Sequence, residues 1–322
     1  MDNIYRILVL LTILTAQNLT TITVTQTPQP PSLSTKIADP VTLNVTVTDK
    51  RDRLVVGLKP SDFEISIDKK PAHIVSLRYV DQPLSVGILL DSSASMSSRS
   101  DKRLASNLGV LREGLRHFLE VSNQANDYFL LGFNIKPELL ADWTSDPSAI
   151  LSRFDHLRVS GNTAFYDACY LAVDKLHSAR NAKRVLVLIS DGQDNVSQYT
   201  FNELRELLRE TNVLVYSIYF SNTVNSGSAL GMEGSAILEQ LSFLSGGRVY
   251  FTKEGVALRS ADADAIFELI ASELRSQCTL TIAPDDPLSS KKWHQIKVKV
   301  KLPPEREIKG LSVRTREGFY AH

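Results

Sequence analysis

Oxygen-bearing side chains gather at three points of the sequence, each beside a predicted strand end or helix start. They are Asp91, Ser93 and Ser95 after one buried strand, Thr163 before a helix, and Asp191 after a later buried strand. Ligands of open α/β sheets collect at the carboxyl ends of parallel strands. If the two strands are neighbours, the two carboxylates converge, and burial would remove their charge unless a cation neutralised them.

The types of these side chains favour a hard cation. Neutral hydroxyls combined with few carboxylates suit a six-coordinate ion such as Mg²⁺ that keeps some waters, and Mn²⁺ or Ca²⁺ are alternatives. A zinc site would use His or Cys, and none adjoins these motifs. Each element also has an ordinary interpretation, because Asp91 or Thr163 alone could cap a helix and Asp191-Gly192 could be a plain turn.

Two further aspartates are weaker candidates for a supporting role around the metal. Asp167 could brace the serine loop as an acceptor, or it could be a solvated charge on a helix. Asp194 could support the site in the same way, although an ordinary loop residue is the simpler interpretation.

Apolar runs alternate with helical patterns through the middle of the chain. Near-continuous runs typical of strands buried on both faces occur at 84–90, 128–133, 185–189 and 213–220, with shorter strands predicted at 139–143 and 248–251. Leucine spacing predicts a helix over 104–118, and the capping box Thr200–Glu203 predicts a helix start. The pattern predicts an α/β fold with a doubly wound, mostly parallel sheet.

The two flanks of this region have a different pattern. Apolar residues alternate with polar ones in 42–48, 63–67 and 296–301, which predicts half-buried antiparallel strands. Each flank is marginal as an independent core, so we expect both to fold together as one smaller β-sandwich into which the α/β domain is inserted. The predicted organisation is a signal peptide (1–17), a linker (18–38), one half of the flanking β-domain (39–82), the α/β domain (83–276) and the other half of the β-domain (277–322).

The N-terminal segment has the pattern of an export signal. A short start with Arg6 is followed by the apolar run 7–14 and by Ala16. The run is too short to span a bilayer, and no later stretch is long and apolar enough to do so. We therefore expect an exported protein that is secreted, periplasmic or held at the cell surface, with no membrane span after cleavage.

Composition excludes several classes of function. Lys plus Arg and Asp plus Glu both number 36 in the 322 residues, and this neutral balance argues against nucleic-acid binding. The two cysteines lie far apart in predicted domains of different type, which favours free thiols over a disulfide. The Gly- and Ser-rich stretch 221–235 is expected to be a loop at the metal-bearing edge.

Together, Asp91-x-Ser93-x-Ser95, Thr163 and Asp191-Gly192 resemble the von Willebrand factor A domain, over roughly 84–275. They supply the five positions of that family's metal-ion-dependent adhesion site. The flanks also resemble exported bacterial proteins of the VWFA-related subfamily, known mostly from acidobacteria. The segments that carry this second resemblance are 55–70 and the closing phrase Arg316-Glu-Gly-Phe-Tyr-Ala321.

The resemblance implies roles for the five residues. Ser93, Ser95 and Thr163 would touch the metal directly, whereas Asp91 and Asp191 would act largely through water. The open metal position would then take a Glu or Asp carboxylate from a protein partner. A cation with few direct charges from the protein remains electrophilic, so it seeks an outside anion.

Three functions compete at this stage. A non-enzymatic, cation-dependent adhesion or protein-binding module is favoured. The first alternative is an assembly subunit of an envelope complex in which the metal loop is purely structural. A metal-dependent hydrolase is less favoured, because the sequence has no Gly-x-Ser-x-Gly elbow and no His beside the three motifs.

Overall fold

The computed structural model describes residues 40–94, 103–157, 159–220, 229–252 and 258–321. The predicted signal peptide, the whole of the predicted linker, and Ser95 lie outside the described residues. Within the described part, no helix combines the length and apolarity needed to cross a membrane.

A six-stranded sheet forms the centre of the α/β part, in the order β6-β5-β4-β7-β8-β9. Its strands are β4 (Leu84–Asp91), β5 (Asp127–Phe133), β6 (Pro137–Thr144), β7 (Lys183–Ser190), β8 (Val213–Tyr219) and β9 (Arg248–Phe251). All pairs are parallel except β5 with β6, which is antiparallel and places β6 at one edge. The predicted mostly parallel sheet, including its short edge strand, is confirmed.

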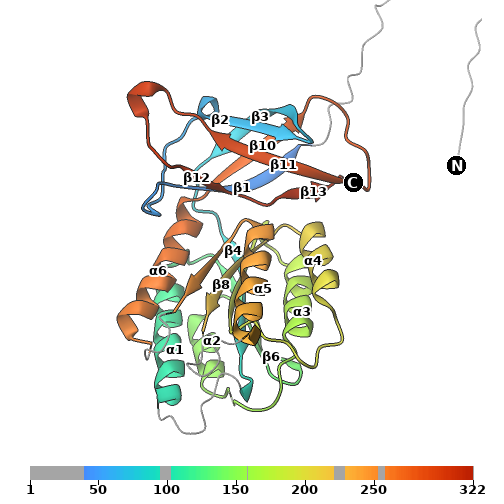
Figure 1. Cartoon of the computed structure of the whole chain (residues 1–322). Helices are drawn as coiled ribbons and strands as arrows, with labels where there is room; N and C mark the ends of the chain where they lie inside the picture. Colours follow the sequence, from blue (N-terminus) through green and yellow to red (C-terminus); the bar gives the residue numbers. More distant parts are fainter. Residues whose placement is uncertain (1–39, 95–102, 158, 221–228, 253–257, 322) are drawn as a thin grey trace, which may run out of the picture. The chain divides into compact units, whose positions relative to one another are not determined.

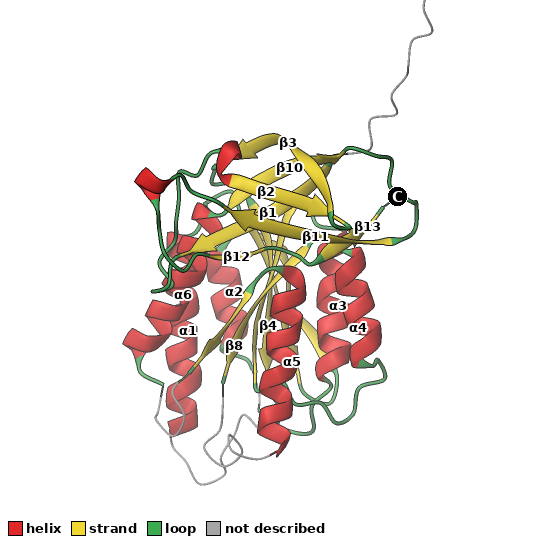
Figure 2. Ribbon diagram, turned by 45° about the horizontal axis from the view of Figure 1, so that its top comes forward, coloured by secondary structure: helices red, strands yellow, loops and turns green. Residues whose placement is uncertain are grey.

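Helices cover both faces of this sheet (Figures 1 and 2). One face carries α1 (Arg103–Val121), α2 (Pro147–Phe154) and α6 (Ser260–Ser276), and the other carries α3 (Phe165–His177), α4 (Phe201–Glu210) and α5 (Ala229–Ser245). Thr200 caps α4 through the predicted capping box. Strand side chains therefore divide between two cores, because successive residues point to opposite faces.

The two flanks of the sequence form one antiparallel sheet in the order β12-β1-β10-β3-β2-β11-β13. Its strands are β1 (Val41–Thr48), β2 (Phe63–Ile67), β3 (Lys70–Arg78), β10 (Cys278–Pro284), β11 (Trp293–Val300), β12 (Ser312–Arg314) and β13 (Gly318–Tyr320). N-terminal strands pair with C-terminal ones, β1 and β3 with β10 and β2 with β11, so the two flanks fold together as expected. The predicted sandwich takes the form of a single curled sheet around its own core.

β1 is buried on both faces, unlike the half-buried strand that its alternation predicted. Thr46, on the polar side of the strand, is 2% exposed and donates to the Glu273 carboxylate of α6 at 3.2 Å. Glu273 also accepts from Tyr216 of β8 at 2.6 Å and from Arg314 of β12 at 2.7 Å. This buried carboxylate therefore joins the antiparallel sheet to the α/β part.

Both cysteines are buried and free. Cys169 lies in α3 and Cys278 begins β10. Burial raises the pKa of the Cys169 thiol well above its ordinary value, so this thiol stays protonated at neutral pH.

Candidate metal centre

Asp91 and Asp191 lie at the carboxyl ends of two neighbouring strands. Asp91 is the last residue of β4, and Asp191 directly follows β7. The two strands pair in parallel with Leu90 opposite Ile189, so both chains reach the same edge of the sheet together. β5 lies on the other side of β4, which makes this the point where the strand order reverses. The two strands are therefore neighbours, which is the condition for the Asp91 and Asp191 carboxylates to converge.

Asp91 is held in a fully buried position by donors on both of its oxygens. Its side chain is 1% exposed, its Oδ1 accepts from the Ser93 backbone at 2.8 Å, and its Oδ2 accepts from the Ser190 hydroxyl at 2.6 Å. Burial, followed by the charge of Asp191, raises the Asp91 pKa to about 7. A metal-free site therefore disfavours the charge that a cation would stabilise.

Thr163 is tied to the segment that follows Asp191. The Thr163 backbone N–H donates to the Asn195 side chain at 2.9 Å, and the Asn195 N–H donates back to the Thr163 carbonyl at 3.0 Å. The Val196 N–H donates to the same carbonyl at 3.4 Å. Thr163 is 2% exposed, although it lies in a loop before α3. The structure thus connects the threonine loop with the Asp191 loop.

Asp194 caps α3 from outside the helix. Its Oδ1 accepts from the backbone N–H groups of Phe165 and Tyr166 at 2.8 and 3.2 Å, while the preceding Ala164 offers no side-chain cap. A carboxylate at a helix N-terminus satisfies unpaired donors and interacts favourably with the helix dipole. Asp194 therefore fixes the start of α3, directly after Thr163.

Asp167 holds the same segment from the opposite direction. Its Oδ1 accepts from the backbone N–H groups of Gln198 and Tyr199, both at 2.8 Å. This partner is the segment after Asp191, whereas the sequence suggested the serine loop. Asp167 and Asp194 thus connect α3 and residues 194–199 in both directions. Neither is among the buried oxygen ligands proposed for the cation.

Gly192 allows the Asp191 loop to pass close to α5. It has φ +73°, and a Cβ at this position would lie 2.2 Å from the Gly234 carbonyl oxygen. Both the left-handed conformation and the close approach require glycine. Gly234 belongs to α5, so residues 229–235 are helical, contrary to the predicted loop; residues 221–228 lie outside the described part.

The serine loop is attached to the segment before Thr163. The Ser160 N–H donates to the Ser92 carbonyl at 2.8 Å, and the Ala94 N–H donates to the Gly161 carbonyl at 2.9 Å. Ser93 is fully buried next to Asp91. The structure thus brings together the loops of four of the five predicted residues; Ser95 lies outside the described residues.

The donors described here fit a hard cation in type. They are two carboxylates and two hydroxyls, all at most 4% exposed: Asp91, Ser93, Thr163 and Asp191. In the described residues no group of three or more His, Cys, Asp or Glu side chains could hold a metal. Hydroxyl oxygens would have to complete the coordination.

Sequence reasoning missed two supporting residues. Ser190 donates to Asp91, and its hydroxyl also accepts from the Gly192 N–H at 3.0 Å. Asn195, the second of them, accepts from the Thr163 N–H. The capping preference of Asn was a signal that could have indicated its role, but its partner lies 32 residues earlier.

We expect Asp194→Ala to destabilise the protein by about 1–2 kcal/mol and to weaken Mg²⁺ binding, because the start of α3 positions Thr163. Chemical denaturation and Mg²⁺ titration calorimetry measure the two effects. Asp146→Ala is the matched control, since Asp146 caps α2 by accepting from Ser148 at 2.9 Å. A similar loss of stability with unchanged Mg²⁺ affinity is expected for the control. Equal Mg²⁺ affinity in both variants would contradict a positioning role for Asp194.

The arrangement of β4, β7 and their loops has a counterpart among known families. Residues 86–193 match the model of the von Willebrand factor type A domain. This match covers both aspartates, Ser93, Ser95 and Thr163, and it ends one residue after Gly192. No curated protein matches the chain.

Several solved structures are similar to part of this chain. The vWF domain of the type V pili tip protein Mfa5 from Porphyromonas gingivalis is 20% identical with TM-score 0.32, covering 36% of this chain and 40% of that one. The PilB minor pilin from Streptococcus sanguinis is 15% identical with TM-score 0.47, covering 61% and 62%. A von Willebrand factor type A protein from Catenulispora acidiphila is 10% identical with TM-score 0.46, covering 87% and 74%. The chain thus spans less than two thirds of the Mfa5 and PilB chains.

Proposed function

We propose that this protein is a non-enzymatic binding module that uses a divalent cation, with Mg²⁺ as the expected ion, to capture an acidic side chain of a protein partner. One observation carries the proposal: two buried carboxylates end neighbouring parallel strands, and burial, followed by the charge of Asp191, raises the pKa of Asp91. A bound cation relieves this repulsion. The match of residues 86–193 to the von Willebrand factor type A domain supports the same site.

In this proposal Ser93, Ser95 and Thr163 would hold the cation directly, and Asp91 and Asp191 would act largely through water. The cation would supply an electrophilic position for an outside carboxylate. The chain's own part is to keep these oxygens dry and fixed through Ser190, Asn195 and the loop contacts described above.

Exposed apolar side chains on the segments around the site favour a protein as the partner. Ile135, Val196 and Met232 are 58%, 40% and 60% exposed. Val196 bonds to Thr163, Ile135 lies against Gly161, and Met232 lies two residues before Gly234. Protein interfaces combine such apolar contacts with a few specific polar ones. Export directed by residues 1–17 and membership of the VWFA-related subfamily are part of the same proposal.

The test compares capture of partners from an envelope extract in Mg²⁺ and in EDTA. We expect one or more partners to be retained in Mg²⁺, to be released by EDTA and to be lost in Thr163→Ala. Thr42→Ala, an exposed threonine on β1, is the matched control. A structural metal loop predicts instead that EDTA lowers stability while bound partners stay; that result would favour the assembly-subunit alternative.

A further inference from the structure

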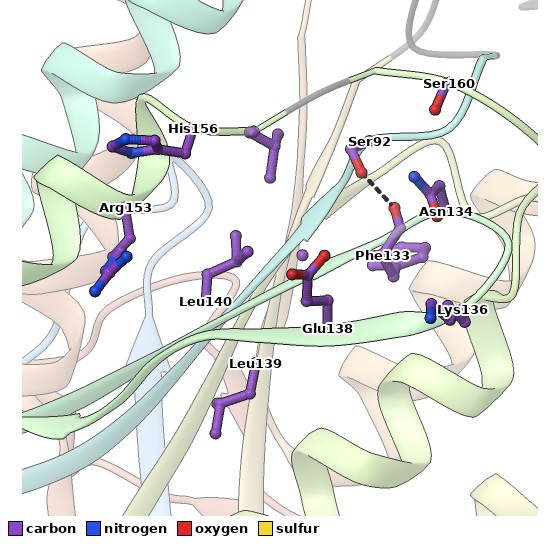
Figure 3. Close-up of a pocket in the computed structure, with 12 residues that line it drawn as sticks. Ser92, Phe133, Asn134, Lys136, Glu138, Leu139, Leu140, Arg153, His156 and Ser160 are labelled. Atoms are coloured by element: carbon purple, nitrogen blue, oxygen red, sulfur yellow. Dashed lines mark hydrogen bonds between the residues drawn. The ribbon is translucent and has the colours of Figure 1, made fainter.

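A cavity of about 420 Å³ lies beside the serine loop (Figure 3). Its walls come from the residue after β4, from the end of β5, from β6 with the turn before it, and from the last turn of α2 with the residues after it. Polar and charged side chains supply much of the lining, namely Ser92, Asn134, Lys136, Glu138, Arg153 and His156. None of them belongs to the set of proposed cation ligands.

The cavity and the proposed metal site share one piece of backbone. Ser92 lines the cavity, and it lies in the chain between Asp91 and Ser93. Its N–H and its hydroxyl both donate to the Phe133 carbonyl, at 2.7 and 2.9 Å. These bonds fix the wall of the cavity relative to the serine loop. The cavity therefore borders the serine loop.

Basic side chains outnumber acidic ones in the lining. Arg153 and His156 lie on one side, Glu138 lies on the other, and Leu140 lies between them (Figure 3). Lys136 adds a further positive charge. Glu138 is the single acidic residue among the described residues of the lining.

The positive charges of this cavity are available to a ligand. Arg153 and Lys136 form no ion pair with any residue that the structure describes. Asp155, two residues after Arg153, is engaged by Arg112 at 2.7 Å. His156 uses Nδ1 to contact the Ser152 carbonyl at 2.8 Å, which leaves its Nε2 without a partner in the described part. An anionic group would gain charge-assisted hydrogen bonds here.

We propose that this cavity is a second subsite for the partner, which takes an acidic side chain near the one that binds the cation. The inference rests on the proposed function, because the first carboxylate sets the position of the second. Leu139, Leu140 and Leu157 supply apolar walls for the methylene stem of a Glu side chain. The cavity has the volume of an ordinary small-ligand pocket, so it holds a side chain with part of its backbone. The preferred partner segment therefore carries two acidic residues.

Glu138 should affect binding of an acidic side chain in the opposite direction to Arg153. Glu138 and Arg153 lie on opposite sides of Leu140 in the cavity (Figure 3). Glu138 therefore repels an incoming anion while Arg153 attracts it. Removing Glu138 should strengthen binding of the second acidic residue, and removing Arg153 should weaken it.

The experiment uses capped peptides of Gly, Ser and Ala that carry one Glu, or two Glu separated by one to five residues. Dissociation constants are measured by nuclear magnetic resonance titration with Mg²⁺ present. We expect the best two-Glu peptide to bind about tenfold more tightly than the one-Glu peptide, as a charged hydrogen bond contributes. Arg153→Gln should abolish this tenfold difference in affinity, and Glu138→Gln should increase it. Arg51 is an exposed arginine in another loop, so Arg51→Gln should leave the difference unchanged.

The outcomes separate the two proposals. If one-Glu peptides bind only with Mg²⁺ but a second Glu adds nothing at any spacing, the subsite is overturned and the proposed function stands. An unchanged difference in affinity in Arg153→Gln also overturns the subsite. If neither kind of peptide binds in Mg²⁺, the proposed function fails and the subsite fails with it. If Thr163→Ala binds neither the one-Glu nor the two-Glu peptides, both kinds of peptide depend on the cation site, which supports the proposal.

Discussion

Asp191→Asn is expected to stabilise the metal-free protein at about pH 8 by about 1–2 kcal/mol and to abolish the stabilisation that Mg²⁺ gives the parent. The charge of Asp191 is, after burial, the main cause of the raised pKa of Asp91. The amide keeps an oxygen that can accept from Gln193, as Asp191 does at 3.1 Å, but it removes the charge. For the parent, Mg²⁺ at 100 times its dissociation constant should add about 2.7 kcal/mol.

The pH dependence of the parent follows from the same carboxyl. Burial and Asp191 raise the Asp91 pKa from its ordinary 3.8 to about 7, so folding favours the protonated form. The contribution to stability is full below pH 3.8, falls as pH rises towards 7, and is lost above it. A bound cation compensates the charge. Stabilisation by Mg²⁺ should therefore increase between about pH 5 and 8.

Urea denaturation with Mg²⁺ or with EDTA, at about pH 5 and at about pH 8, measures these effects. Asp174→Asn is the matched control, because Asp174 is an exposed carboxylate of α3. It should leave the stability and the response to Mg²⁺ unchanged. If Asp191→Asn responds to Mg²⁺ as the parent does, the two aspartates do not share a cation.

Arg314→Gln is expected to reduce the free energy of unfolding by about 3 kcal/mol. Arg314 is the cationic partner of Glu273, whose side chain is only 4% exposed. Without it, the carboxylate keeps Tyr216 and Thr46 as donors, but its charge is no longer compensated. Removing one member of a buried ion pair costs more than the pair contributes.

The double variant Glu273→Gln with Arg314→Gln should recover much of this loss, because no buried charge remains. Arg259→Gln is the control, since Arg259 pairs with Asp262 where its side chain is 64% exposed; a change below about 1 kcal/mol is expected. Thermal and urea denaturation measure Arg314→Gln, Glu273→Gln, the double variant and the Arg259→Gln control. Additive effects of the two single substitutions would argue against a direct coupling of Glu273 and Arg314.

The strands of the parallel sheet could be predicted because their signal is local. A continuous apolar run such as that of β4 or β7 reports burial on both faces, and the residue after it must then lie at a sheet edge. This reasoning identified Asp91 and Asp191. The order of strands was needed to bring them together, and the sequence left it open, because alternating strands and helices do not by themselves fix which strands are neighbours.

The residues that support the site could not be predicted in the same way. Asn195 and Asp194 act on backbone groups of Thr163 and α3 through loop geometry, which periodicity does not report. The polar face of β1 is likewise buried where Thr46 donates to Glu273, which lies 227 residues after Thr46 in the chain. Contacts of this kind are specified only by the assembled tertiary structure.

The pairing of β3 with β10 also bears on how such a protein could be modified. Arg78 and Thr279 lie opposite each other in this antiparallel pair, so the chain leaves the β-sheet and returns to it on adjacent strands. The whole α/β part is thus a detour within what would otherwise be a hairpin. The α/β part can therefore be exchanged by a single graft between two neighbouring positions of the seven-stranded sheet, whose own strand pairing does not pass through it.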